Sequence, residues 1–366
     1  MCKNKKSSLF IKVISVIMVM ILCGSIAIMA AEGEEYSKEE LKKRILDEAV
    51  LIEKEFDDIS EISLSEDLWS DCVIIGSGDK FKVKLYEWVE NEYTITVNNG
   101  ILEIENNSAD IYMKTSAGNT PNWVNAILQE MKRSPNPESA ESGNRVIEIT
   151  LPEDFILDDL EVDFNIGGIK IENCEIKNID TRFKVGNIEI NNSKIDLINC
   201  RINVGNIEIN NSKIDFINCR INVGNGVLDN TNSEECYIEI DVGGMEINNS
   251  EFKSIDCRID VGNVVLYNTN SEECYVEINV GDFEITSGDI ENLTVNVSKG
   301  NINIKLPDIK KYRIILKITK FSKMKVNEKE YTYNDNDSKR YVLNPTAKNK
   351  MNLSVSHGEC IITTQD

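Results

Sequence analysis

The chain has 366 residues, with 40 Lys and Arg against 62 Asp and Glu, a formal net charge of −22 and a sequence pI near 4.6. This acidity argues against a nucleic-acid partner and against anchoring on anionic lipid headgroups, because both need a basic surface. Because His357 is the single histidine, Ser-His-Asp catalysis, Cys-His catalysis and multi-histidine metal sites are nearly excluded.

Residues 1–31 have the pattern of an export segment. Four lysines precede a run of 19 uncharged residues, Val13 to Ala31. Two interpretations remain open. A run of this length can span a bilayer core of ~30 Å as an N-terminal membrane anchor, whereas Ala30 and Ala31 before the polar Glu32 suit cleavage of a signal peptide. Either way, we expect the functional part outside the cytoplasm, extracellular or associated with the cell envelope.

The segment 32–58 is predicted to be an amphipathic helix. Ser37 to Glu40 forms a capping box, and apolar residues recur at helical spacing as far as Phe56. The following region, 59–165, changes to short alternating runs typical of strands, with an inserted loop near 108–144 that is rich in Ser, Asn, Pro and Gly. It leads through Val146–Leu151 into the first repeat.

An internal repeat dominates residues 166–306. Eight glycines recur every 19 residues, and we expect them at a structural corner where a positive φ is tolerated: Gly167, Gly186, Gly205, Gly224, Gly243, Gly262, Gly281 and Gly300. A second corner is predicted six positions later, where asparagines such as Asn192 and Asn211 can hydrogen-bond along the column.

Aligned positions of the repeat alternate between apolar and polar residues, which is the period of a β-strand. The aliphatic columns, including the residue immediately before each glycine (Val204 and Val223, for example), are expected to form the buried face. A single unit cannot bury this face alone, but stacked units can. The sequence therefore predicts an all-β protein, a right-handed parallel β-solenoid of 19-residue coils with flanking β-strand caps and an N-terminal helix.

After Leu306-Pro307 the spacing is lost, and residues 307–366 are predicted to be a C-terminal β cap that closes the open end. Strands are expected at Tyr312–Ile318, Tyr341–Leu343, Met351–Val355 and Cys360–Thr364, with a further short one near Tyr331.

Several motifs resemble a known family. They are the strand pair Cys72–Val83 with Gly76 and Gly78, the lead-in Ile147–Pro152, and units such as Val280–Ile285 and Gly300–Ile304. Together they resemble the bacterial β-strand-repeat family of unknown function whose members are called "putative adhesins", over roughly residues 59 to 366. The resemblance implies a cell-envelope or surface protein with a β-solenoid and no established catalytic residues.

The ten cysteines do not follow a disulfide pattern. Cys200, Cys219 and Cys257 share one inward column, and Cys236 and Cys274 share another, at positions that Ile or Val also occupy. We expect them to be reduced, buried hydrophobic residues, because most pairs lie two coils apart and beyond disulfide reach.

Two outward columns carry charge. Arg182, Arg201, Arg220 and Arg258 form one stripe, and Glu189, Glu208, Glu246 and Glu284 form the other. The simpler interpretation is a solvated face with weak ion pairs, and the functional one is a ladder that binds a repetitive ligand. A catalytic site, a metal site and a cofactor are not predicted, because the acidic residues repeat with the columns and form no unique cluster.

The favoured function is a non-enzymatic exported binding protein, an adhesin or surface scaffold, with a wall polysaccharide, a host surface or an envelope protein as partner. The membrane would be contacted only through an uncleaved N-terminal segment. A membrane-anchored sensory or regulatory envelope protein and a polysaccharide-active β-helix enzyme are the alternatives, the second of them disfavoured.

Overall fold

The computed structural model describes residues 50–65, 71–87, 92–107, 146–319, 321–331 and 339–364. The chain divides into two units, residues 1–47 and 48–366, and the fold described below belongs to the second. The export segment and most of the predicted helix lie outside the described residues. Among those described, no helix has the length and apolar character to cross a membrane.

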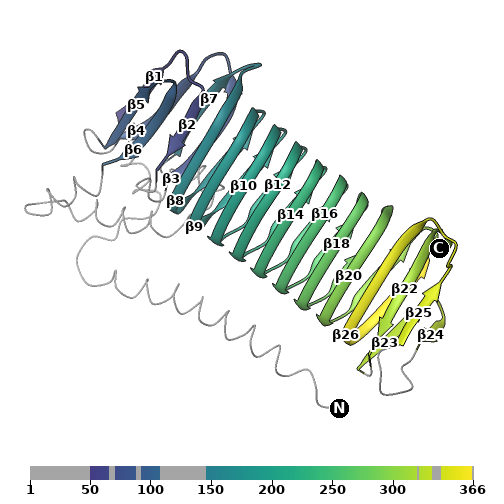
Figure 1. Ribbon diagram of the computed structural model, residues 1–366. Coiled ribbons are helices and arrows are strands. Elements are labelled where there is room, and N and C mark those ends of the chain that lie inside the picture. The colour runs from purple at the N-terminus through teal and green to yellow at the C-terminus, as the bar shows by residue number, and fades with distance from the viewer. Residues whose placement is uncertain are drawn as a thin grey trace, which may run out of the picture. The chain divides into compact units, whose positions relative to one another are not determined.

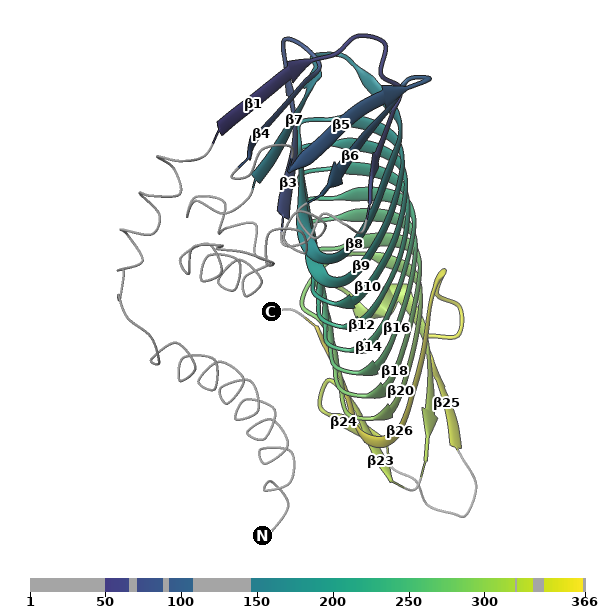
Figure 2. The same ribbon diagram turned by 90° about the vertical axis from the view of Figure 1, so that its left-hand side faces the viewer.

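Parallel pairing with a constant offset of 19 residues organises the central repeats. Lys194 pairs with Lys213, which in turn pairs with Asn232, and the same step continues along the stack. Like residues therefore lie above like residues, which buries the aliphatic columns between successive rungs. The strands follow one another side by side in Figure 1 and nest behind one another in Figure 2. The all-β prediction is confirmed.

Each central rung consists of one long and one short strand. The first two rungs run through in single strands, β8 (Ile156–Glu172) and β9 (Glu175–Asn191). The long strands that follow are β10 (Lys194–Val204), β12 (Lys213–Val223), β14 (Asn232–Val242), β16 (Glu251–Val261), β18 (Asn270–Val280) and β20 (Ile290–Lys299). The short strands are β11 (Ile207–Asn210), β13 (Gly226–Asp229), β15 (Met245–Asn248), β17 (Val264–Tyr267), β19 (Phe283–Ile285) and β21 (Ile302–Leu306).

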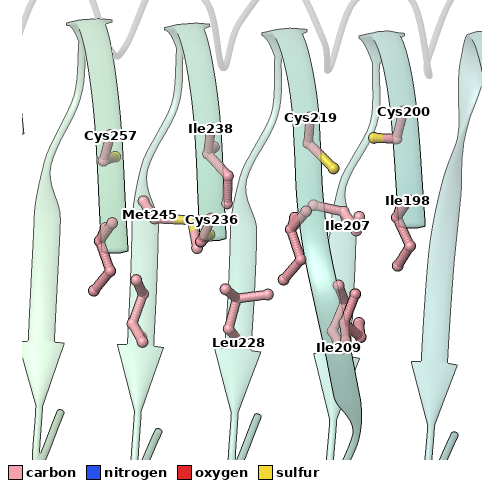
Figure 3. Packing of buried hydrophobic residues seen from close by; sticks show 14 of the residues in the cluster. Ile198, Cys200, Ile207, Ile209, Cys219, Leu228, Cys236, Ile238, Met245 and Cys257 are labelled. Carbon is pink, nitrogen blue, oxygen red and sulfur yellow. The ribbon is translucent and has the colours of Figure 1, made fainter. Parts of the chain in front are cut away.

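The core is a continuous column of aliphatic and thiol side chains inside the stack. Cys200, Cys219 and Cys257 lie in this interior beside isoleucines of neighbouring rungs, and each is at most 2% exposed (Figure 3). The predicted burial of the cysteines is confirmed. All eight described cysteines are free thiols, in keeping with the expectation that they serve as small hydrophobic residues.

The glycine corner is required by the close approach of one rung to the next. A Cβ atom at Gly243 would lie 1.6 Å from the carbonyl oxygen of Gly224, and Gly243 has φ of +150°. Both features exclude an ordinary side chain. The same carbonyl-on-glycine stacking recurs up to Gly300 and then at Gly358.

The second corner uses asparagine in the left-handed region. Asn192, Asn211, Asn230, Asn249 and Asn268 have φ between +48° and +51°. Their side chains connect some of the rungs: Asn230 Nδ2 donates to Asn211 Oδ1 at 2.8 Å, and Asn268 Nδ2 donates to Asn249 Oδ1 at 3.2 Å. The predicted amide ladder is therefore present at these positions.

Both ends of the stack contain strands from sequence-distant segments. At the C-terminal end, β26 (Asn349–Thr364) lies between β20–β21 on one side and β22 (Tyr312–Ile318) with β23 (Ser322–Val326) on the other. Antiparallel strands β25 (Lys339–Leu343) and β24 (Lys329–Tyr331) then cover the outer edge, and the 3₁₀ helix η2 (Ile309–Lys311) leads into β22. Residues 349–364, expected in the cap, thus form a further rung.

The N-terminal end is built in the same way. The strands β2 (Glu61–Leu64) and β3 (Asp71–Gly78) lie between β8 and the outer pair β6 (Ile101–Asn106) and β7 (Val146–Pro152). Antiparallel strands β4 (Lys82–Glu87), β1 (Val50–Glu55) and β5 (Tyr93–Asn98) complete this end. The predicted strand segments of residues 59–107 are present, and the loop near 108–144 lies outside the described residues.

The helix prediction is wrong for residues 50–55. These residues form β1, which pairs antiparallel with β4. The apolar spacing that indicated a helix is satisfied differently: Ile52 packs on the core, and the ring of Phe56 contacts Phe81 edge-on at 6.5 Å. The antiparallel pairing of β1 with β4 has overridden the local helical pattern.

Candidate functional site

The arginine column lies on the long-strand face, and three of its four arginines pair with carboxylates, whereas Arg201 forms no ion pair with the described residues. The register places Arg182, Arg201, Arg220, Glu239, Arg258 and Glu277 on one line. Arg220 donates to Glu239 Oε2 at 3.1 Å through Nε, and this bond lowers the pKa of the Glu239 carboxyl. The glutamates that interrupt the arginine stripe therefore compensate its charge.

Arg258 contacts both a carboxylate and two aromatic rings on this face. Its guanidinium forms two bonds to the Asp256 carboxylate, at 3.0 and 2.9 Å, and lies between the rings of Tyr237 and Tyr275. Arg182 has weaker contacts, 3.7 Å to Asp180 and 3.8 Å to Asp163. The pairing supports the interpretation of this stripe as a solvated, ion-paired face.

The glutamate column lies on the short-strand face and alternates with valine over its second half. Glu208, Val227, Glu246, Val265 and Glu284 follow one another in register. The carboxylates accept bonds from neighbouring amides, such as Asn210 Nδ2 to Glu208 at 2.9 Å and Asn248 Nδ2 to Glu246 at 2.8 Å. Glu189, at the start of the column, lies 3.3 Å from the Lys170 ammonium. The valines separate the later carboxylates by two rungs.

A groove of about 550 Å³, which the sequence did not predict, crosses five successive rungs where the long strands begin. It is lined by two outward columns and the inward column between them: Lys213, Asn232, Glu251, Asn270 and Asp289; Asp215, Glu234, Lys253, Glu272 and Glu291; and Ser233, Phe252 and Ser271. Six of these side chains are carboxylates and two are ammonium groups, so the groove is acidic.

The hollow arises from a break in the repeat. In other rungs, the inward position of this column is occupied by isoleucine, as at Ile195, Ile214 and Ile290. Ser233 and Ser271 replace isoleucine in the two rungs on either side of Phe252. Each serine hydroxyl bonds to backbone carbonyls, Ser233 to Asp215 O at 3.1 Å and Ser271 to Glu273 O at 2.7 Å. The loss of two branched side chains is the sequence signal that could have indicated this groove.

Several carboxylates of the groove have no counter-ion. Within the described residues, the side chains of Glu251, Glu272 and Glu291 form neither an ion pair nor a hydrogen bond, whereas Glu234 lies 3.5 Å from the Lys253 ammonium. Like charges on adjacent rungs repel one another. The groove therefore differs from the arginine face, where Arg182, Arg220 and Arg258 each lie beside a carboxylate.

A second pocket of about 310 Å³ continues the groove toward the C-terminal cap. The Tyr312 hydroxyl donates to Asp289 Oδ1 at 2.9 Å, and Lys311 lies 3.6 Å from the same carboxylate. Burial is the main cause that raises the pKa of Tyr312. Asp289 is thus balanced by the cap, and the free carboxylates lie further along the stack.

The valine column before the glycines is on the surface, so its predicted burial is wrong. Val204, Val223, Val242, Val261 and Val280 are 43–47% exposed. The strand turns away from the core after the preceding isoleucine, such as Ile240 (1% exposed), so the two-residue alternation stops at the corner. The chain thus carries an exposed apolar row along one edge.

His357 and Cys360 do not form a chemical pair. The His357 ring stacks on Phe321 at 4.8 Å near the surface, whereas Cys360 points into the core and is fully buried. Burial raises the pKa of the Cys360 thiol to about 12. In the described ranges, no set of three or more His, Cys, Asp or Glu side chains is arranged to hold a metal ion.

These features define an all-β protein of stacked parallel rungs with an acidic groove among its described residues. The sequence profile of the Toastrack DUF4097 family matches residues 59–241 and again 191–363. The protein therefore belongs to the Toastrack DUF4097 family, and the family resemblance stated from the sequence is confirmed. No curated protein matches the chain.

Two of the solved structures that are similar to the chain have adhesion-related descriptions. One is a "putative adhesin" from Bacteroides fragilis, with 15% identity and a TM-score of 0.43, covering 70% of this chain and 96% of that one. The other is a "putative cell adhesion protein" from Clostridium sporogenes, with 13% identity and a TM-score of 0.17, covering 87% of this chain and all of that one.

Proposed function

We propose that the protein is a non-enzymatic, exported cell-envelope scaffold, an adhesin in the broad sense, that binds an extended ligand along its groove. The observation that carries the proposal is the row of carboxylates that five successive rungs contribute to one groove. Its repeat distance of ~4.8 Å suits a polymer that presents equivalent groups at regular intervals. A right-handed course of the 19-residue coils is part of this proposal, since parallel crossovers are almost always right-handed.

The charge of the groove selects the class of ligand. Six carboxylates against two ammonium groups favour a polymer with positive charge, such as a wall polysaccharide with free amino groups. The unpaired Glu251, Glu272 and Glu291 gain a counter-ion on binding, whereas three of the four arginines of the stripe, Arg182, Arg220 and Arg258, already have a carboxylate partner. We therefore assign binding to the groove rather than to either predicted stripe.

The test compares two oligosaccharides with the same sugar backbone, one with free amino groups and one with these groups acetylated. Calorimetry at low salt should show binding of a glucosamine hexamer and none of its N-acetylated counterpart. Glu251→Gln and Glu272→Gln should each weaken binding several-fold, because each removes one charge from the groove, and added salt should weaken it further. Glu208→Gln is the matched control, since Glu208 lies on the other face. Equal loss in the control, or no binding of the cationic hexamer, would refute the proposal.

A polysaccharide-active enzyme is the second candidate, because an acid-lined groove is also where such chemistry would take place. In that case, incubation with a cationic or neutral polysaccharide would release shorter products. A single Glu→Gln change in the groove would abolish release rather than weaken it. Stable complexes without products favour the scaffold.

A further inference from the structure

The C-terminal strand β26 fills a gap between two rungs that are consecutive in the sequence. Lys350 pairs in parallel with Asn292 on one side and with Arg313 on the other. Asn292 and Arg313 are 21 positions apart, close to the regular repeat of 19, yet they lie two rungs apart in space. Two rungs that are consecutive in the sequence are therefore separated here by one further rung, which is formed by a strand from a later part of the chain.

The same arrangement occurs at the opposite end. Cys72 of β3 pairs with Val146 and with Gly168, which are 22 positions apart. At both ends, a segment from the chain's own terminal region is inserted between sequence-adjacent rungs. The opening of the stack is thus a general feature of the fold rather than a local irregularity.

The side chains of β26 are those of a repeat unit. Met351, Leu353, Val355, Cys360 and Ile362 enter the core and are at most 2% exposed. Gly358 takes the glycine corner, with φ of +148° and its Cβ position 1.7 Å from the Gly300 carbonyl oxygen. Any copy of this strand would fill the gap with the same contacts.

The connection that leads into β26 has to pass across a strand. β25 pairs with one edge of β22 and β26 with the other, so residues 344–348 span two strand spacings of ~4.8 Å each. Asn344 starts this crossing with φ of +48°, and its amide donates to Ile309 O and Tyr312 O, both at 3.1 Å. Pro345 follows directly. A short crossing of this kind is a known setting for strand exchange.

We propose that β26 exchanges between two copies of the chain, each copy filling the gap of the other in a two-fold symmetric, tail-to-tail dimer. The occupant is β26 of a second copy. This strand has the same sequence, so its register, its glycine corner and its five apolar side chains fit the gap in the same way. Exchange leaves these contacts unchanged in number, and residues 344–348 would then connect the two copies. High local concentration on a cell surface would favour it.

The experiment detects exchange in the full chain. Thr294→Cys and Asn352→Cys are placed in separate chains; Asn352 Nδ2 lies 3.3 Å from Thr294 Oγ1 across β26 and β20. The two chains are unfolded together, refolded and treated with a short thiol-bridging reagent. We expect a covalent heterodimer whose yield rises with protein concentration.

The matched control uses Asn199→Cys and Asn218→Cys, which occupy the same column on two regular rungs at 3.0 Å. No exchangeable strand lies there, so we expect no heterodimer. Absence of the heterodimer from the Thr294→Cys and Asn352→Cys mixture at every concentration, or equal yield in the control, would overturn the proposal.

Discussion

Substitution of the neighbouring residues Gly243 and Gly244 tests the stacking of the rungs most directly. In Gly243→Ala, the new Cβ would lie 1.6 Å from the Gly224 carbonyl oxygen, whereas an ordinary contact needs more than 3 Å. The two rungs must therefore separate locally. The backbone bond from Gly243 N–H to Val261 O, now 2.9 Å, would lengthen or break.

The expected cost follows from two effects. Holding alanine at φ of +150° costs about 1–3 kcal/mol, and an unsatisfied backbone group costs a further 1–3 kcal/mol or so. We expect Gly243→Ala to lower the free energy of unfolding by about 3–5 kcal/mol. With a urea dependence of about 3 kcal/mol/M, the midpoint should fall by ~1 M or more.

Gly244→Asn is the matched control one residue along the chain. Gly244 is not in the left-handed region, and its Cβ position lies 3.3 Å from Asn263 O. Asparagine already holds this column at Asn206, Asn225 and Asn263, where Asn225 N–H bonds to Asn206 Oδ1 at 2.9 Å. The change should alter stability by less than about 1 kcal/mol. Urea unfolding followed by circular dichroism measures both, and equal midpoints for the two variants would refute the stacking argument.

Three further predictions follow from burial and pKa. Ile240→Ala should lower the free energy of unfolding by about 2–5 kcal/mol, because the Ile240 side chain is 1% exposed. Val242→Ala should lower it by less than about 1 kcal/mol, because Val242 is 44% exposed. Similar urea midpoints for the two variants would contradict the assignment of the valine column to the surface. Leu353→Ala in β26 should likewise cost about 2–5 kcal/mol, because Leu353 is 2% exposed, and a variant as stable as the parent would argue against β26 as a core rung. Burial raises the pKa of Cys174, Cys274 and Cys360 from 9.0 to about 12, so these thiols lose their protons at higher pH in the folded state than in the unfolded state. The free energy of unfolding should therefore be constant below about pH 9 and fall above it, by up to ~1.4 kcal/mol per pH unit and thiol. Urea midpoints at pH 7, 9 and 10.5 would measure this fall, and a flat profile would disprove it.

The sequence by itself determined the all-β class and the alignment of like residues. A 19-residue period with glycine at one corner and asparagine at the other leaves few alternatives, because each column must meet its own equivalent in the next unit. The same period placed Cys200 and Cys219 in the core. It also predicted the arginine and glutamate columns, although it could not show that Glu239 and Asp256 would pair with the arginines.

Tertiary structure decided the ends, the corner and the groove. The rungs formed by β2–β3 and β26 join segments far apart in the chain, so no local pattern reveals them, even though Gly358 repeats the corner chemistry of Gly300. Val242 has the same local pattern as Ile240, but it faces solvent because the backbone turns there. The groove depends on two serines flanking Phe252, and their effect emerges only when three rungs lie side by side, since a hollow is a property of neighbours in space.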